Sequence, residues 1–217
     1  MKGLLIKDLK LIMTQKLFLF IVGVISCYLL ATGKAEFGMI YTTMILAMLV
    51  ISTISFDDHD NGMSFLFTFP ISRKIYVMEK YLLGIILAAV AMAAGCGILM
   101  IVSLAKPADY TMQEWFSAGL GSLLTASALL SGSLPLQLKF GAEKGRIVTA
   151  TIFICVAVAG YTIQQVVKAA SIDLSAAVEP FLQADATEVA AAVSVLAIGL
   201  LAASYVVSVA IMKKKQF

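Results

Sequence analysis

Six long apolar segments, separated by short polar connections, dominate this sequence of 217 residues. A helix that spans a bilayer needs about 20 mainly apolar residues, because lipid offers no hydrogen-bond partner to exposed backbone groups. Hydrophobic residues make up 61% of the chain and charged residues 13%, whereas soluble proteins carry about 25% charged residues. The sequence therefore predicts an all-α integral membrane protein with a single membrane domain over residues 1–217.

The expected transmembrane helices cover residues 17–32, 37–56, 81–104, 115–136, 147–167 and 189–212. The first of these is short for a span. A cleaved signal peptide is the competing interpretation of this first segment, since four lysines precede an apolar run. Five further apolar segments follow, and the run begins far from Met1, so a retained membrane helix is favoured.

The positive charges lie almost entirely on alternate connections. On the side of the amino terminus are 13 of the 16 Lys and Arg residues, and the other side holds only Lys34, Lys106 and Lys168. By the positive-inside rule, both termini are expected in the cytoplasm. The net charge of +3 is too small to indicate a nucleic-acid partner.

The segment ahead of the first span has the pattern of an amphipathic helix. Apolar residues recur there at helical spacing, with basic and polar residues largely elsewhere on the wheel: Leu5, Leu9, Ile12 and Met13 against Lys2, Lys7, Lys10 and Gln15. Such a helix can lie in the headgroup layer and contact anionic lipid. Alternatively, it is the cytoplasmic end of the first span, and the pattern does not decide between the two.

The connection between the second and third spans, residues 57–80, is the longest one on the cytoplasmic side. It opens with acidic residues, turns at Asn61 and Gly62, and then carries three phenylalanines. Ser72 is a good N-cap for a helix that continues through Lys80 into the third span. The phenylalanines require cover from lipid, from the protein's own span ends or from a partner, whose groove buried aromatic anchors would fill.

Catalytic and metal-binding chemistry is not indicated by the sequence. Asp57, Asp58, His59 and Asp60 are adjacent and point in different directions on any regular element, which disfavours a metal site. The phosphate-binding pattern G-x-x-x-x-G-K-[ST] does not occur, so ATP hydrolysis is not expected in this chain. Within the six expected spans almost no side chain is ionisable, which argues against an ion channel or a proton-coupled carrier.

Two cytoplasmic connections resemble those of a known family. The first reads F-x-F-P-I-S-R-K-x-Y-V-x-x-K-Y from Phe67 to Tyr81, after an acidic stretch and Asn-Gly. The second reads P-x-x-x-K-F-G-x-E-K-G-R from Pro135 to Arg146. Together with the order of the six spans, these motifs resemble the ABC transporter type 2 permease family, and the resemblance extends over essentially the whole chain.

The resemblance implies a short coupling helix between spans 2 and 3 that sits on a separate ATPase subunit. On the positions that match, the coupling residues are Asp57, Asp58, Asp60, Asn61, Phe65, Leu66, Phe67, Phe69 and Arg73. A second cytoplasmic contact is implied at Lys139, Glu143, Lys144 and Arg146, whose alternative interpretation is an ordinary positively charged loop. Aromatic residues are expected to dominate the affinity, since exposed ion pairs contribute at most about 1 kcal/mol each.

The same resemblance implies the partners. These are a cytoplasmic ABC ATPase that binds ATP and magnesium, a second permease protomer in a homodimer or heterodimer, and membrane lipid; this chain itself binds no cofactor. The expected function is export of amphipathic or antimicrobial-type peptides, or of another hydrophobic cargo, across the bacterial cytoplasmic membrane. The alternative is a membrane scaffold or sensor that docks a cytoplasmic partner through residues 57–74 without transporting anything.

Overall fold

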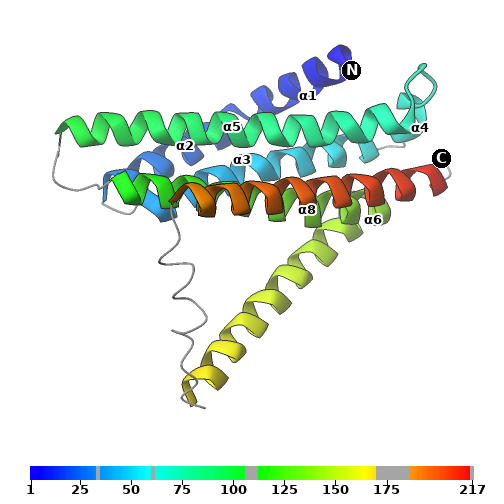
Figure 1. Cartoon of the computed structure of the whole chain (residues 1–217). Coiled ribbons are helices and arrows are strands. Elements are labelled where there is room, and N and C mark those ends of the chain that lie inside the picture. Colours follow the sequence, from blue (N-terminus) through cyan, green and yellow to red (C-terminus); the bar gives the residue numbers. More distant parts are fainter. Residues whose placement is uncertain (33–34, 60–61, 106–111, 170–185, 216–217) are drawn as a thin grey trace.

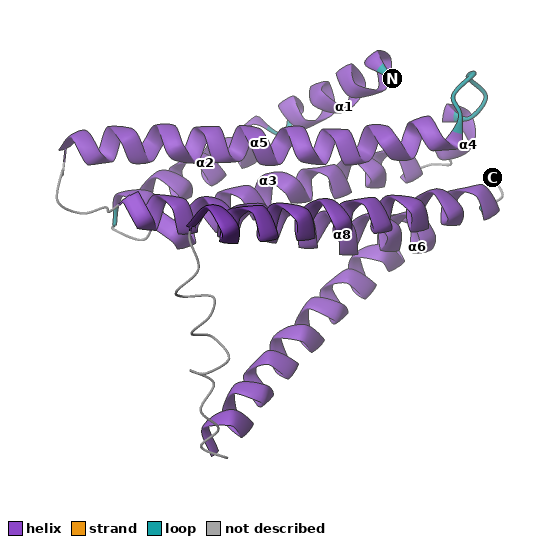
Figure 2. Cartoon of the chain, viewed as in Figure 1, coloured by secondary structure: helices purple, strands orange, loops and turns teal. Residues whose placement is uncertain are grey.

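The computed structural model describes residues 1–32, 35–59, 62–105, 112–169 and 186–215. Within these ranges the regular structure is helical and no strand occurs. The helices are α1 (Lys2–Thr14), α2 (Lys16–Ala31), α3 (Ala35–Asp58), α4 (Gly62–Leu66), α5 (Arg73–Ala105), α6 (Met112–Ala169) and α8 (Ala186–Lys214). The all-α fold predicted from the apolar segments is thus confirmed (Figure 2).

Four of these helices are long and apolar enough to cross a membrane. They cover Ala35–Asp58, Arg73–Leu104, Trp115–Gly141 and Thr187–Lys214, and a fifth span is possible if α1 and α2 together form one broken span. With 16 residues, α2 alone is about 24 Å long at 1.5 Å per residue, shorter than the hydrocarbon core of about 30 Å. The expected span at residues 147–167 is helical but is not among these candidates in the described part of the chain, so a total of six spans stays a prediction.

The bundle consists of α2, α3, α5, α8 and the first part of α6, which lie side by side in Figure 1. Its core includes Val50, Ile54, Leu83, Leu134 and Met212, all fully buried. Both termini, α4, and the point where α6 bends lie at one end of the bundle. The polar connections that carry the two sequence motifs are therefore neighbours in space.

The bend in α6 occurs at Gly141, which has φ 78° and ψ −177°. This backbone conformation is essentially restricted to glycine, because a Cβ atom would collide with the neighbouring backbone. Beyond Gly141 the helix leaves the bundle at a steep angle (Figure 1). The second motif, predicted as a loop, is instead continuously helical apart from this one residue, which makes the turn.

At the start of the chain, α1 is a separate helix, bent by 73° from α2 at Gln15. Its buried residues are Leu4, Asp8 and Ile12, which follow one another at intervals of four and form one stripe against α3 and α5. Of the expected apolar face, Ile12 and Leu5 pack toward the core, whereas Leu9 and Met13 are exposed. These exposed residues follow the spacing of a helix face that contacts lipid.

The start of α5 agrees with the sequence prediction. The Ile75 backbone N–H donates to Ser72 Oγ over 3.3 Å, so Ser72 is the N-cap and satisfies one of the free amides of the first turn. At the next residue, the Arg73 guanidinium donates from Nη1 to the carbonyl oxygens of Met212 (3.1 Å) and Lys213 (2.7 Å). The first residue of α5 thereby closes the last turn of α8.

Gly141→Ala is expected to lower the free energy of unfolding by about 1–3 kcal/mol, because alanine is strained at this backbone conformation. A Cβ at this position would also lie 2.8 Å from Asp58 Oδ2. Thermal unfolding in detergent, followed by circular dichroism, measures the change. Gly132→Ala in the same helix is the matched control, since a Cβ there meets nothing within 4 Å, and equal destabilisation by both variants would contradict the proposed strain.

Candidate functional site

The short helix α4 and the turn that follows it, residues 62–69, present one apolar side to the bundle and another to the outside. Met63 is buried in the main core, and the Phe67 ring packs edge-on against Tyr76 with ring centroids 5.8 Å apart. Phe65 and Phe69 point the other way, with 68% and 52% of their surfaces exposed. Their rings contact each other in a T-shaped pair, with centroids 5.4 Å apart. Residues 62–69 thus combine side chains buried in the bundle with an exposed aromatic pair.

The other residues of the expected coupling element occupy different environments. Leu66 is half-buried against the core, and Arg73 is engaged with the end of α8. Asp58 lies 4.0 Å from Lys215 Nζ. Asp60 and Asn61 lie outside the described residues.

Asp57 is placed in the interior, which differs from its expected role as a surface acid that pairs with a partner. The residue is only 7% exposed. Its carboxylate accepts hydrogen bonds from Lys7 Nζ and from the Tyr76 hydroxyl (3.0 Å), and it lies 2.8 Å from Lys80 Nζ. In this arrangement, Asp57 organises the helices beneath α4 and is not presented to an outside partner.

Around the bend of α6, the second expected contact is partly visible. Lys139 and Lys144 are exposed, and Lys139 Nζ lies 5.0 Å from the centroid of the Phe140 ring. The side chains of Glu143 and Arg146 lie outside the described part of the structure. The proximity of Gly141 to Asp58 joins this bend to the carboxyl end of α3, so the two sequence motifs form one polar surface.

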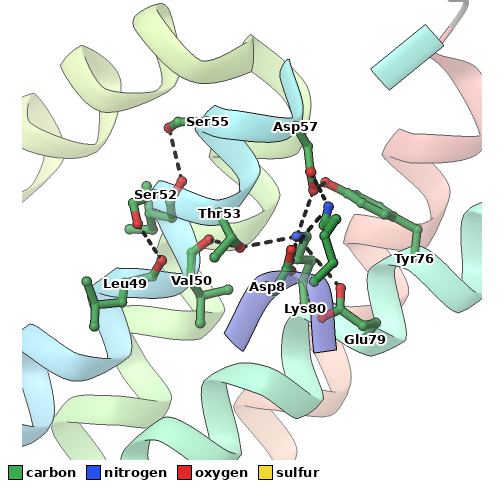
Figure 3. A network of polar contacts seen from close by, with 12 residues as sticks. Asp8, Leu49, Val50, Ser52, Thr53, Ser55, Asp57, Tyr76, Glu79 and Lys80 are labelled. Atoms are coloured by element: carbon green, nitrogen blue, oxygen red, sulfur yellow. Dashed lines mark hydrogen bonds and ion pairs between the residues drawn. The ribbon is translucent and has the colours of Figure 1, made fainter. Parts of the chain in front are cut away.

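Beneath that surface lies a buried cluster of charges centred on Lys80 (Figure 3). The Lys80 side chain is fully buried. Its ammonium group donates to Asp8 Oδ2 and to Thr53 Oγ1 (3.1 Å), and it pairs with Asp57. Thr53 accepts this bond because its own hydroxyl proton is donated to the Val50 carbonyl oxygen over 2.8 Å.

The cluster joins three helices. Asp8 comes from α1, Thr53 and Asp57 come from α3, and Lys80 comes from α5. Because a buried charge without a partner is very unfavourable, each of these side chains depends on the others. The arrangement therefore locks the amino-terminal helix onto the two helices that flank α4.

Sequence analysis did not identify Asp8, Thr53, Tyr76, Glu79 or Lys80 as site residues. Tyr76 and Lys80 are fixed positions of the first motif, but no role was assigned to either of them. A signal was present at Asp8, which falls midway between Leu4 and Ile12 at helical spacing. An acid within an apolar stripe predicts a buried partner, although the stripe itself does not identify that partner.

An apolar pocket of about 370 Å³ lies further along the bundle, between α5, α6 and α8. Its lining is almost entirely hydrophobic, and the only hydroxyl groups come from two serines. The lining residues are Ile85, Ala88, Ala89, Met92, Leu123, Ala126, Ser127, Leu130, Ser194, Ala197, Ile198 and Leu201. A hollow of this composition suits an apolar group rather than an ion.

Comparison with known proteins gives one match. A family model described as "ABC-2 family transporter protein" matches residues 3–213, nearly the whole chain. No curated protein and no solved structure matches the chain.

Replacing Lys80 with Met is expected to reduce the free energy of unfolding by about 3–5 kcal/mol, since it leaves buried carboxylates without their cation. Denaturant unfolding in detergent measures this loss. Lys74→Met, in the same helix but at an exposed position, is the control and is expected to change little. A Lys80→Met protein as stable as the control would mean that the cluster does not hold the helices together.

Proposed function

The chain belongs to the ABC-2 family of transporter membrane proteins, and we propose that it is the permease subunit of an ATP-driven exporter. Its helices fit a membrane transport component. Since the sequence contains no phosphate-binding loop of the Walker type, ATP and magnesium bind to a separate ABC ATPase. The exposed aromatic pair formed by Phe65 on α4 and Phe69 in the turn after it is the observation that carries the proposal.

The aromatic pair has the properties of a docking anchor. Large aromatic side chains that become fully desolvated usually supply most of the energy of a protein interface. A short helix followed by a turn, each with one exposed ring, matches a groove on a partner better than it matches lipid, because this segment lies among charged chain ends. Phe65 and Phe69 are therefore the proposed anchors on the ATPase.

Force applied at α4 has a direct route into the bundle. Met63 and Phe67 pack into the core, and Phe67 contacts Tyr76 near the start of α5. Tyr76 in turn donates to Asp57 at the end of α3. A movement imposed on α4 by an ATPase is thus delivered to α3 and α5 together, the behaviour required of a coupling helix.

Lys139 and Lys144 provide the proposed second contact. They are exposed beside the bend at Gly141, and Gly141 itself is adjacent to Asp58. The partner ATPase or anionic lipid would meet these lysines, with Glu143 and Arg146 completing the surface. Rim charges of this kind adjust association rate and register more than affinity.

The proposed orientation puts this end of the bundle in the cytoplasm of a bacterial cell. The end carries α4 and both chain termini, and the distribution of lysines and arginines follows the positive-inside rule. With residues 17–32 and 147–167 counted as spans, the chain crosses the membrane six times. The second part of α6 exposes apolar side chains such as Ile147, Ile154 and Val158, a surface suited to lipid and to a second permease protomer, identical or similar.

Amphipathic peptides or another hydrophobic molecule are the proposed cargo. The pocket between α5, α6 and α8 is lined by aliphatic side chains and two serines, which matches an apolar segment of such a molecule. Self-protection against antimicrobial peptides is the corresponding cellular role.

The double variant Phe65→Ala with Phe69→Ala is expected to weaken ATPase binding by roughly 30-fold or more, as loss of about 2 kcal/mol of anchor energy implies. Co-purification and titration with the ATPase in detergent measure the effect. Phe116→Ala, an exposed phenylalanine on α6 far from α4, is the matched control. Unchanged binding by the double variant would remove α4 as the docking element.

Purification of the tagged chain from its native membrane, followed by mass spectrometry, is expected to yield a stoichiometric ABC ATPase. The complex in inverted vesicles is expected to accumulate a fluorescent amphipathic peptide only when ATP is hydrolysed. An ATPase without peptide accumulation would reject the cargo. A preparation that contains a partner but no ATPase would instead support the scaffold or sensor function.

A further inference from the structure

The buried cluster contains one carboxyl group more than its cations can neutralise. Asp8, Asp57 and Glu79 face Lys80 and Lys7. Asp8, Glu79 and Lys80 are completely inaccessible to solvent, and Asp57 is nearly so. With every group ionised, the cluster holds a net negative charge in a region that solvent does not reach, an arrangement that is strongly unfavourable.

Glu79 is the carboxyl group that lacks a hydrogen-bond partner. Both of its oxygens are buried without a hydrogen bond. A lysine ammonium has three N–H donors, and those of Lys80 are directed to Asp8, Asp57 and Thr53. The Lys80 nitrogen therefore remains 3.7 Å from Glu79 Oε2, an electrostatic contact without a hydrogen bond.

Asp8, on α1, also has an oxygen without a hydrogen bond. This atom is Oδ1, although Lys7 Nζ is 3.1 Å away from it. Both carboxyl groups contact the Lys80 ammonium group, Asp8 through a hydrogen bond and Glu79 over 3.7 Å, so they are neighbours, and a proton on one of them allows a hydrogen bond between the two. One proton thus satisfies two orphan acceptors and removes the excess charge in a single step.

We propose that Glu79 and Asp8 form a proton-binding site, in which the Glu79 carboxyl donates to Asp8 Oδ1 and so fastens α1 to α5. A proton fits better than a metal ion, because the Lys80 ammonium would repel a second free cation at this distance. No covalent chemistry is involved: the proton is taken from water and returned to water. The titratable groups that face the site are Lys7 and Asp8 from α1, Asp57 from α3, and Tyr76, Glu79 and Lys80 from α5.

The proposed proton-binding site does not depend on the identity of the cargo or on the ATPase. Release of the proton leaves two adjacent carboxylates, which repel one another across the joint between α1 and α5. Between mildly acidic and neutral pH, the folded chain keeps a proton that an exposed glutamate has already released. The free energy of unfolding therefore falls as pH rises through this range. Any step of the cycle that separates α1 from α5 exposes this site to water.

Infrared spectroscopy of the purified full chain in detergent tests the proposal directly. The expected result is a C=O stretching band of a protonated carboxyl group at mildly acidic pH that disappears on titration through neutral to alkaline pH. Glu79→Gln, which keeps the shape and a donor, is expected to abolish the band, while Glu188→Gln, at an exposed position of α8, leaves it unchanged. The wild-type titration remains decisive even if a variant fails to fold.

Thermal unfolding across the same pH range gives an independent measurement. The melting temperature of the wild type is expected to fall between mildly acidic and neutral pH more steeply than that of Glu79→Gln. Absence of a protonated carboxyl band in the wild type would overturn the proposal. So would a band that persists in Glu79→Gln, or stabilisation by sodium at alkaline pH in place of the proton, which would identify a cation site.

Discussion

A lysine with no access to water determines how the amino-terminal half of this protein is assembled. Lys80 sits where α1, α3 and α5 meet, and its three donors reach Asp8, Asp57 and Thr53. Lipid or apolar packing could hold these helices together, but only approximately. A buried ammonium group requires specific acceptors at specific positions, so it fixes the register of the three helices relative to one another. Residues 62–69, which include α4, pack on the helices that this cluster holds in place.

Much of the fold could be predicted because its signals are local. Continuous apolar runs identify the long helices, and Ser72 before Arg73 identifies the beginning of α5. The family was also recognised from two short motifs, and the match over residues 3–213 confirms it. In the second motif, which was predicted as a loop, the helix is interrupted only at Gly141, whose φ is positive.

The buried cluster could not be predicted in the same way, since its members are distant in sequence. Asp8 and Lys80 are 72 positions apart, and helical periodicity assigns an acid to the solvent side by default. For this reason Asp57 was predicted to lie at the surface, since it precedes Asp58 in an acidic run. Its side chain instead faces the interior. Glu79 and Lys80 lie just before the apolar segment at 81–104, where the scarcity of ionisable residues within the spans gave no warning of buried charge.

The position of Asp8 along its helix has a mechanical meaning. It is the seventh of the 13 residues of α1, and Leu4 and Ile12, four residues to either side, are buried with it in one stripe. The helix is therefore held along about 12 Å of its length, with the buried ion pair at the centre and an apolar contact on each side. A contact of that length resists tilting, so α1 moves with α3 and α5 as one body, and a displacement of these helices reaches α2 through the bend at Gln15.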